Sequence, residues 1–94
     1  MWVLRVVVRV PDAKRKEFAN ALEKLPLADP SHPDVAEMYE GVEDRTRVCW
    51  HAYWSSEANA RAFLRSNAYR AVRGAARVAG ELEAIEFGSG ESIT

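Results

Sequence analysis

Three side chains have functional groups that could take part in catalysis: Asn59, Tyr69 and His51. An amide donor such as Asn59 could hold a substrate carbonyl and stabilise the charge that develops when a phenol loses its proton, an effect that is largest where water is excluded. Tyr69 could donate to bound oxygen, and His51 could act as a general base near neutral pH. Each residue also has a structural interpretation: Asn59 as a polar residue on a helix surface, Tyr69 as a core aromatic and His51 as an ordinary strand histidine.

The spacing of these residues predicts where a pocket would lie. Asn59 and Phe63 are four residues apart, hence on one face of a helix, and Ser66-Asn67 interrupts that helix before Tyr69. We therefore expect a pocket between a sheet and a pair of helices, with Phe63 as a wall and with Asn59, Tyr69 and His51 as its polar contacts.

Two further residues are candidates for substrate binding, Arg5 and Tyr53. Tyr53 has the same parity as His51 on a predicted strand, so both side chains should lie on one face of it. Arg5, like Arg9, could bind a carboxylate or an enolate, or could pair with Glu37 on a neighbouring strand.

The first half of the chain contains the elements that would position these groups. The segment 2–10 is almost entirely apolar and rich in β-branched residues, which predicts a strand with Leu4, Val6, Val8 and Val10 on one face and Arg5 and Arg9 on the other. A helix should begin at Asp12 as its cap and bury Phe18, Ala21, Leu22 and Leu25. Three prolines then predict a flexible loop over 26–34.

The second half predicts a hairpin, two helices and a last strand. Segments 35–41 and 46–54 have strand-forming residues and a short polar connection, 42–45. Ser55 is expected to cap a helix, and a third helix should run from Ala68 to Ala79 and end at Gly80. Segment 82–87 predicts an edge strand, followed by a tail over 88–94.

This order of elements predicts a fold. Strand, helix, two strands, two helices and strand form the split βαβ pattern of a ferredoxin-like α+β domain, with an antiparallel sheet and helices on one side. We expect one domain over 1–94. The uncovered sheet face, with Val3, Val7, Cys49 and Tyr53, predicts a homodimer that buries it, in a dimeric α+β barrel.

Composition excludes several classes of protein. The 94 residues are 48% apolar, enough for one core, and 13 basic against 14 acidic residues give a net charge of −1. We therefore expect no nucleic-acid partner and no membrane partner. Arg5 and Arg9 interrupt the first apolar run, and a single cysteine indicates a reducing compartment, so a cytoplasmic location is expected. No cluster of ligands is spaced for a metal, and none is predicted.

The segment Tyr53-Trp54-Ser55-Ser56-Glu57-Ala58, followed by Phe63-Leu64-Arg65-Ser66-Asn67-Ala68-Tyr69, resembles the antibiotic biosynthesis monooxygenase family of dimeric α+β barrels. The likeness extends over most of the chain, from Val3 to Phe87. It implies the same fold and a homodimer. That family includes cofactor-free oxygenases, haem-degrading enzymes and members without known activity.

The resemblance implies different site residues for two branches of the family. Haem-degrading members have a tryptophan and a histidine where this chain has Phe63 and Arg73, so no haem is expected here. Cofactor-free oxidases of polycyclic phenols have an asparagine, a tryptophan and a tyrosine at the positions of Asn59, Phe63 and Tyr69. Two of these three groups are retained.

Two functions follow from these observations. The first is a cofactor-independent monooxygenase, or a related enzyme, that acts on a small aromatic or quinone-like compound. The second is a homodimer of the same fold that binds a small ligand without catalysis. The retained Asn59 and Tyr69 favour the enzyme, and the loss of the tryptophan at position 63 favours the binding protein.

Overall fold

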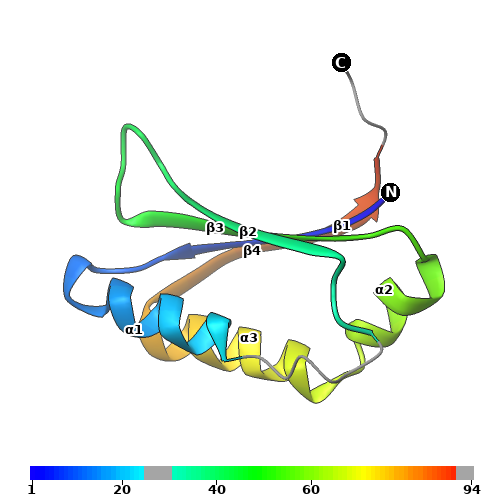
Figure 1. The fold of residues 1–94 in the computed structure, drawn as a ribbon. Helices are drawn as coiled ribbons and strands as arrows, with labels where there is room; N and C mark the ends of the chain where they lie inside the picture. Colours follow the sequence, from blue (N-terminus) through cyan, green and yellow to red (C-terminus); the bar gives the residue numbers. More distant parts are fainter. Residues whose placement is uncertain (25–30, 91–94) are drawn as a thin grey trace.

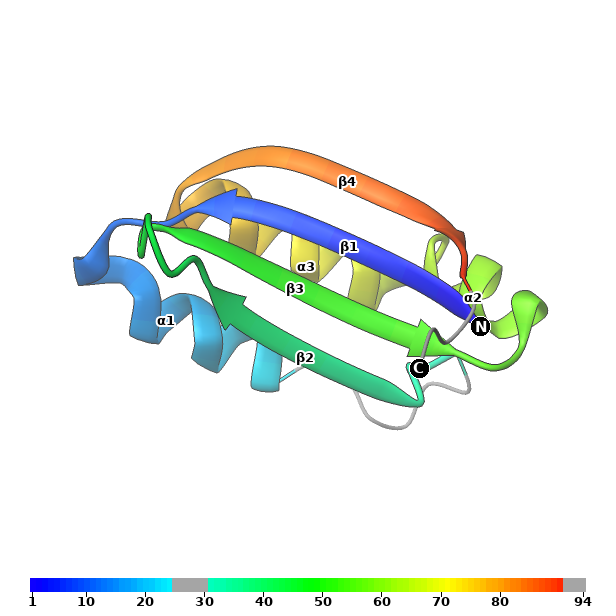
Figure 2. The same ribbon diagram turned by 90° about the horizontal axis from the view of Figure 1, so that it is seen from above.

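The computed structural model describes residues 1–24 and 31–90. The elements, in chain order, are β1 (Trp2–Arg9), α1 (Asp12–Glu23), β2 (Val35–Glu40), β3 (Arg47–Trp54), α2 (Glu57–Phe63), α3 (Asn67–Ala79) and β4 (Glu81–Ser89). The strands form one antiparallel sheet in the order β2-β3-β1-β4, which Figure 2 shows from above. The predicted ferredoxin-like α+β fold is confirmed.

The helices α1, α2 and α3 lie on the same face of the sheet, and no helix among the described residues lies over the opposite face (Figure 1). The connection between β2 and β3 rises above this open face at one end of the sheet. The molecule therefore has two layers, and the sheet has one covered face and one open face.

Alternation along the two central strands decides which side chains enter the core. Leu4, Val6 and Val8 of β1 are completely buried on the helix side, together with Val10 just beyond the strand. On β3 the buried residues are Val48, Trp50, Ala52 and Trp54. Because side chains alternate along a strand, the intervening residues of β1 and β3 point to the open face. The predicted division of the first strand is confirmed.

An aromatic cluster joins α2 and α3 to the sheet. The ring of Phe63 lies 5.1 Å from that of Trp54, 6.2 Å from Trp50 and 5.9 Å from Tyr69, measured between ring centres. The Trp54 indole N–H donates to the Ser31 carbonyl over 2.8 Å, which attaches the chain before β2 to the core. Phe63 is thus a core residue, with 1% of its surface exposed.

The helix starts differ from two of the predictions. Asp12 is the first residue of α1 rather than its cap, because Pro11 occupies the cap position and no side chain caps the helix. Helix α2 is capped by Ser56, not by the predicted Ser55: the Ser56 hydroxyl accepts from the backbone N–H of Asn59. Ser66 caps α3 in the same way, through the N–H of Tyr69.

The predicted core of the first helix is partly wrong. Phe18 and Leu22 are buried as expected, but Ala21 is exposed. Leu25 lies outside the described residues, as do positions 26–30 of the predicted loop and 91–94 of the predicted tail. The last strand is longer than expected, since β4 includes Gly88 and Ser89.

Gly80 ends α3 where predicted, because the chain there passes very close to β1. A Cβ atom at this position would lie within 1.9 Å of the Arg9 carbonyl oxygen, far inside van der Waals contact. A glycine is therefore required here by the approach of two backbones.

No helix among the described residues is long and apolar enough to cross a membrane.

The capping geometry gives a direct test of where α2 begins. Replacing Ser56 with alanine leaves the N–H of Asn59 without its acceptor and should lower the free energy of unfolding by about 1 kcal/mol. Ser55→Ala is the matched control and should change it by less than about 0.5 kcal/mol. Urea unfolding of the two variants measures both, and a larger loss for Ser55→Ala would contradict this start of α2.

Candidate ligand-binding cavity

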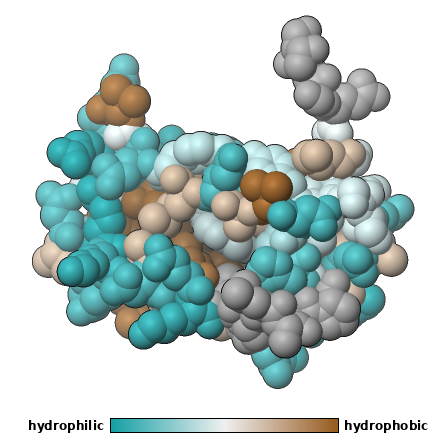
Figure 3. Space-filling model, viewed as in Figure 1, coloured by the Kyte–Doolittle hydropathy of each residue, from teal (hydrophilic) through white to brown (hydrophobic). Residues whose placement is uncertain are grey.

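A cavity of about 320 Å³ lies on the helix side of the sheet, between α1 and the strands β2 and β3. In the space-filling view, hydrophobic side chains line a hollow that polar side chains surround (Figure 3). The cavity is lined by Ala19, Leu22, Glu23, His32, Ala36, Glu37, Met38 and Trp50.

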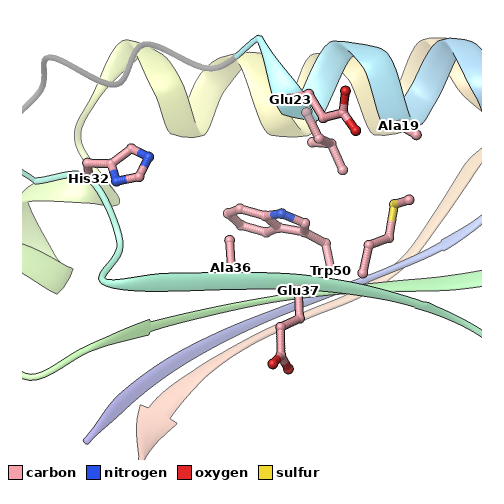
Figure 4. Close-up of a pocket in the computed structure, with 8 residues that line it drawn as sticks. Ala19, Glu23, His32, Ala36, Glu37 and Trp50 are labelled. Carbon is pink, nitrogen blue, oxygen red and sulfur yellow. The ribbon is translucent and has the colours of Figure 1, made fainter.

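Small side chains at two facing positions leave this space open. Ala19 of α1 and Ala36 of β2 lie on opposite walls, where longer side chains would fill the gap (Figure 4). Met38 follows Ala36 by two residues and therefore points to the same side of the strand. It pairs in register with Trp50 of β3, whose indole lies across the floor of the cavity. Apolar groups therefore form most of the wall.

Polar groups stand at particular points of this wall. Glu23 of α1 borders the cavity on its helix side, and the imidazole of His32 stands at its end, before β2 (Figure 4). Glu37 also borders the cavity, but its side chain points to the opposite side of the sheet. The Trp50 indole N–H makes no hydrogen bond with the part of the chain that the structure describes, so this donor is free for a ligand.

The helical residues predicted for catalysis do not line this cavity. Asn59 is exposed on α2, and Tyr69 is half-buried on α3, with its ring against Phe63 and under the guanidinium of Arg73 at 5.7 Å. Phe63 is enclosed in the core and does not line this cavity. The expected pocket beside α2 and α3 is therefore replaced by one beside α1.

The strand residues predicted for the site lie on the open face. Arg5, His51 and Tyr53 have the parity that points away from the helices. His51 is thus separated from Asn59 and Tyr69 by the sheet itself, and the expectation that these three side chains converge in one pocket is wrong. Parity along the strand indicates this separation from the sequence alone, because His51 shares the parity of Tyr53, which the sequence places on the uncovered face.

Arg5 and Arg9 form ion pairs, but not with Glu37. Arg5 contacts Glu86 over 3.4 Å, and Arg9 contacts Glu83 over 3.1 Å and Asp44 over 2.7 Å. Glu37 lies on β2, which does not border β1, so β3 separates it from both arginines. The expected pairing is corrected by the strand order.

Sequence reasoning missed the residues of the cavity. Neither Trp50 nor His32 is among the site residues that the sequence predicts. The sequence offers one hint, the small side chains of Ala19 and Ala36, and it acquires meaning only once α1 is placed over β2. Among the described residues, no group of three His, Cys, Asp or Glu side chains could hold a metal ion.

No family model matches the sequence, and no curated protein matches it. Solved structures do match its fold. One "putative antibiotic biosynthesis monooxygenase", from Chloroflexus aurantiacus, has a TM-score of 0.71 at 13% identity, covering 99% of this chain and 95% of its own. Another of the same description, from Nitrosomonas europaea, has a TM-score of 0.67 at 18% identity over 96% and 98% of the two chains.

A conserved protein from Methanosarcina mazei is similar as well, with a TM-score of 0.69, 16% identity and coverage of 93% and 87%. At these identities the likeness is one of fold. The chain therefore has the ferredoxin-like fold of antibiotic biosynthesis monooxygenases, as the resemblance of its sequence predicted.

Proposed function

We propose that the cavity between α1 and β2 binds a small aromatic compound, and that the protein oxidises this compound as a cofactor-independent monooxygenase. The observation that supports the proposal is the cavity itself, with Trp50 as an aromatic floor. The fold, which this chain shares with proteins described as putative antibiotic biosynthesis monooxygenases, favours an oxygenase reaction.

The dimensions of the cavity limit the ligand. A volume of about 320 Å³ is at the lower end for small-molecule sites, so a compound of one or two rings fits better than a larger one. Trp50 can stack on such a ring, and the thioether of Met38 makes favourable contacts with aromatic groups. The free indole N–H of Trp50 can donate to a hydroxyl or carbonyl oxygen of the ligand.

His32 supplies the group that the reaction requires. An imidazole at the end of the cavity can take the proton of a ring hydroxyl, and the phenolate that results can reduce molecular oxygen. One oxygen atom of O₂ becomes bonded to a ring carbon. The other leaves as water, together with two hydrogen atoms of the substrate. A phenol and O₂ then give a quinone and water, without a further reductant.

The catalytic roles predicted for Asn59, Tyr69 and His51 stay predictions, as do binding roles for Phe63, Arg5 and Tyr53. In the described chain, these residues lie outside the cavity, and they could contribute only through a different site. Our proposal therefore assigns the proton transfer to His32.

A ligand-binding protein without catalytic activity is the second candidate. The observation that favours it is the complete burial of Phe63, at the position where phenol-oxidising relatives have a tryptophan. A buried phenyl ring has no hydrogen-bonding group to offer a substrate. The cavity would then bind the same aromatic compounds and leave them unchanged.

We also propose that two copies of the chain associate through the open face of the sheet. Tyr39 and Val35 of β2 are 44% and 50% exposed, and Val42, in the connection that rises above this face, is 97% exposed. The face also has charged side chains of both signs, such as Arg5 and Glu86. A second copy turned by a two-fold rotation can therefore place its charges against opposite ones. The face is less apolar than expected, because Val7 is already buried within one chain.

Filling the cavity should abolish binding. We expect Ala19→Phe to weaken the binding of 2-naphthol, a fluorescent two-ring phenol, more than tenfold, because the new ring occupies the ligand's space. Ala21→Phe is the matched control: Ala21 is exposed on the same helix outside the cavity, and affinity should stay within twofold. Fluorescence titration gives both affinities. Equal binding by the two variants would place the ligand elsewhere, and Ala36→Phe fills the same space from β2 if Ala19→Phe does not fold.

Oxygen uptake distinguishes the two candidate functions. With a hydroxynaphthalene that binds, we expect consumption of O₂, and His32→Gln should slow it about 100-fold to 10,000-fold, the range for removing a general base. His51→Gln should have little effect if His32 is the base. Binding without oxygen uptake across a panel of phenols and quinols would favour the binding protein. A loss of turnover in His51→Gln but not in His32→Gln would instead assign the general base to His51.

Light scattering tests the self-association. At micromolar concentration and pH 7.5 we expect twice the chain mass of 10.5 kDa. Val42→Asp, at the exposed tip, should shift the equilibrium toward the monomer, whereas Val78→Asp, equally apolar but exposed on α3 of the other layer, should not. A wild-type protein that stays monomeric would contradict the proposal.

A further inference from the structure

His51 lies near the middle of the open face, on the central strand β3. Its register partners are Arg5 on β1 and Glu37 on β2. The side chain is half-buried, and its Nε2 atom is shielded from solvent and has no hydrogen-bond partner among the described residues. The protein thus holds a titratable ring at the surface that we propose as the self-association interface, with one nitrogen unsatisfied.

Two tyrosines hold the imidazole in place. The ring of Tyr39 meets it edge to face, with 4.9 Å between the ring centres and an interplanar angle of 81°. The Tyr53 hydroxyl lies 3.3 Å from Nδ1. The Tyr39 hydroxyl donates to the Glu37 carboxylate over 2.5 Å, and this contact raises the pKa of Tyr39. The Tyr39 phenol therefore stays neutral across the physiological range.

Charged groups face His51 from three strands. Arg5 approaches from β1, Glu37 from β2 and, beyond Arg5, Glu86 from β4. Burial and, secondarily, Arg5 lower the pKa of His51 below its usual 6.5, while the two carboxylates act in the opposite direction. The thiol of Cys49 lies on the same face, and its Sγ is 3.9 Å from Arg5 Nη2.

From this arrangement we propose that His51 makes the association of two copies sensitive to pH, and that the open face closes over a second copy only while both His51 rings are neutral. The inference depends on the proposed self-association. A two-fold interface contains the same surface twice, so both rings enter it together. A proton on each would place two cations in one desolvated layer, each with an Nε2–H that has no acceptor among the described residues of its own chain.

The sign of the effect follows from linkage. Closure of the interface removes water from His51 and lowers its pKa further, so protonation favours the separated chains. The association is then strongest above the pKa of the free chain and weakens as the pH falls through it. If closure lowers each pKa by about one unit, the dissociation constant rises by up to about tenfold for each ring, and about 100-fold for the pair.

Sedimentation velocity over a concentration series tests this inference at pH 7.5, 6.5, 5.5 and 5.0. We expect the dissociation constant of the wild type to rise at least tenfold over this range and that of His51→Gln to stay within threefold. His32→Gln is the matched control, because His32 lies on the helix side of the sheet, and it should keep the wild-type pH dependence. Thermal unfolding at pH 7.5 checks that the variants are folded.

The outcomes separate the two proposals. A wild type that is monomeric at every pH overturns the self-association itself. A dimer whose dissociation constant does not change with pH, or a His51→Gln dimer that keeps the wild-type change, overturns the role of His51 alone. If His51→Gln does not fold or does not associate, NMR titration of the wild-type ring decides: its pKa should be lower at high protein concentration than at low concentration, and equal values would contradict the inference.

Discussion

Three helices cover one face of a four-stranded sheet, and this one-sided packing determines what each part of the molecule can do. The two central strands place their large apolar side chains under the helices, where Phe63 meets Trp50 and Trp54. The same alternation sends Arg5, His51 and Tyr53 to the open face. Because one face must hold the core, the polar and titratable groups of the strands gather on the other.

The cavity is a consequence of the same packing at the edge of the sheet. Helix α1 lies over β2 and β3, but Ala19 and Ala36 are too short to meet between them. The space that remains has an indole floor and a histidine at one end. The walls of this cavity come from a helix, two strands and a core tryptophan, so it needs no large rearrangement to accept a ligand. It is therefore a better candidate site than the surface around the exposed Asn59.

The sequence allowed the fold to be predicted and much less of the site. Periodicity places Leu4, Val6 and Val8 on a buried face, and the order of strands and helices restricts the topology to a ferredoxin-like one. Caps are harder: two serines stand side by side at the start of α2, and only the backbone geometry selects Ser56 over Ser55. The expected convergence of Asn59, Tyr69 and His51 failed because His51 has the strand parity of the open face, whereas Asn59 and Tyr69 lie on helices that cover the other face.

The three tryptophans offer the most direct measurement of the central claim, that the cavity beside α1 binds aromatic ligands. Each indole N–H gives its own signal in a proton–nitrogen NMR spectrum. The indole N–H of Trp54 donates to the Ser31 carbonyl, and the Trp2 ring is stacked on Phe87. The indole N–H of Trp50 has no partner in the described chain. Titration with 2-naphthol should shift the Trp50 indole signal saturably and leave the other two nearly unchanged. Saturable binding that moves the Trp2 or Trp54 signal instead, with Trp50 unaffected, would contradict the account.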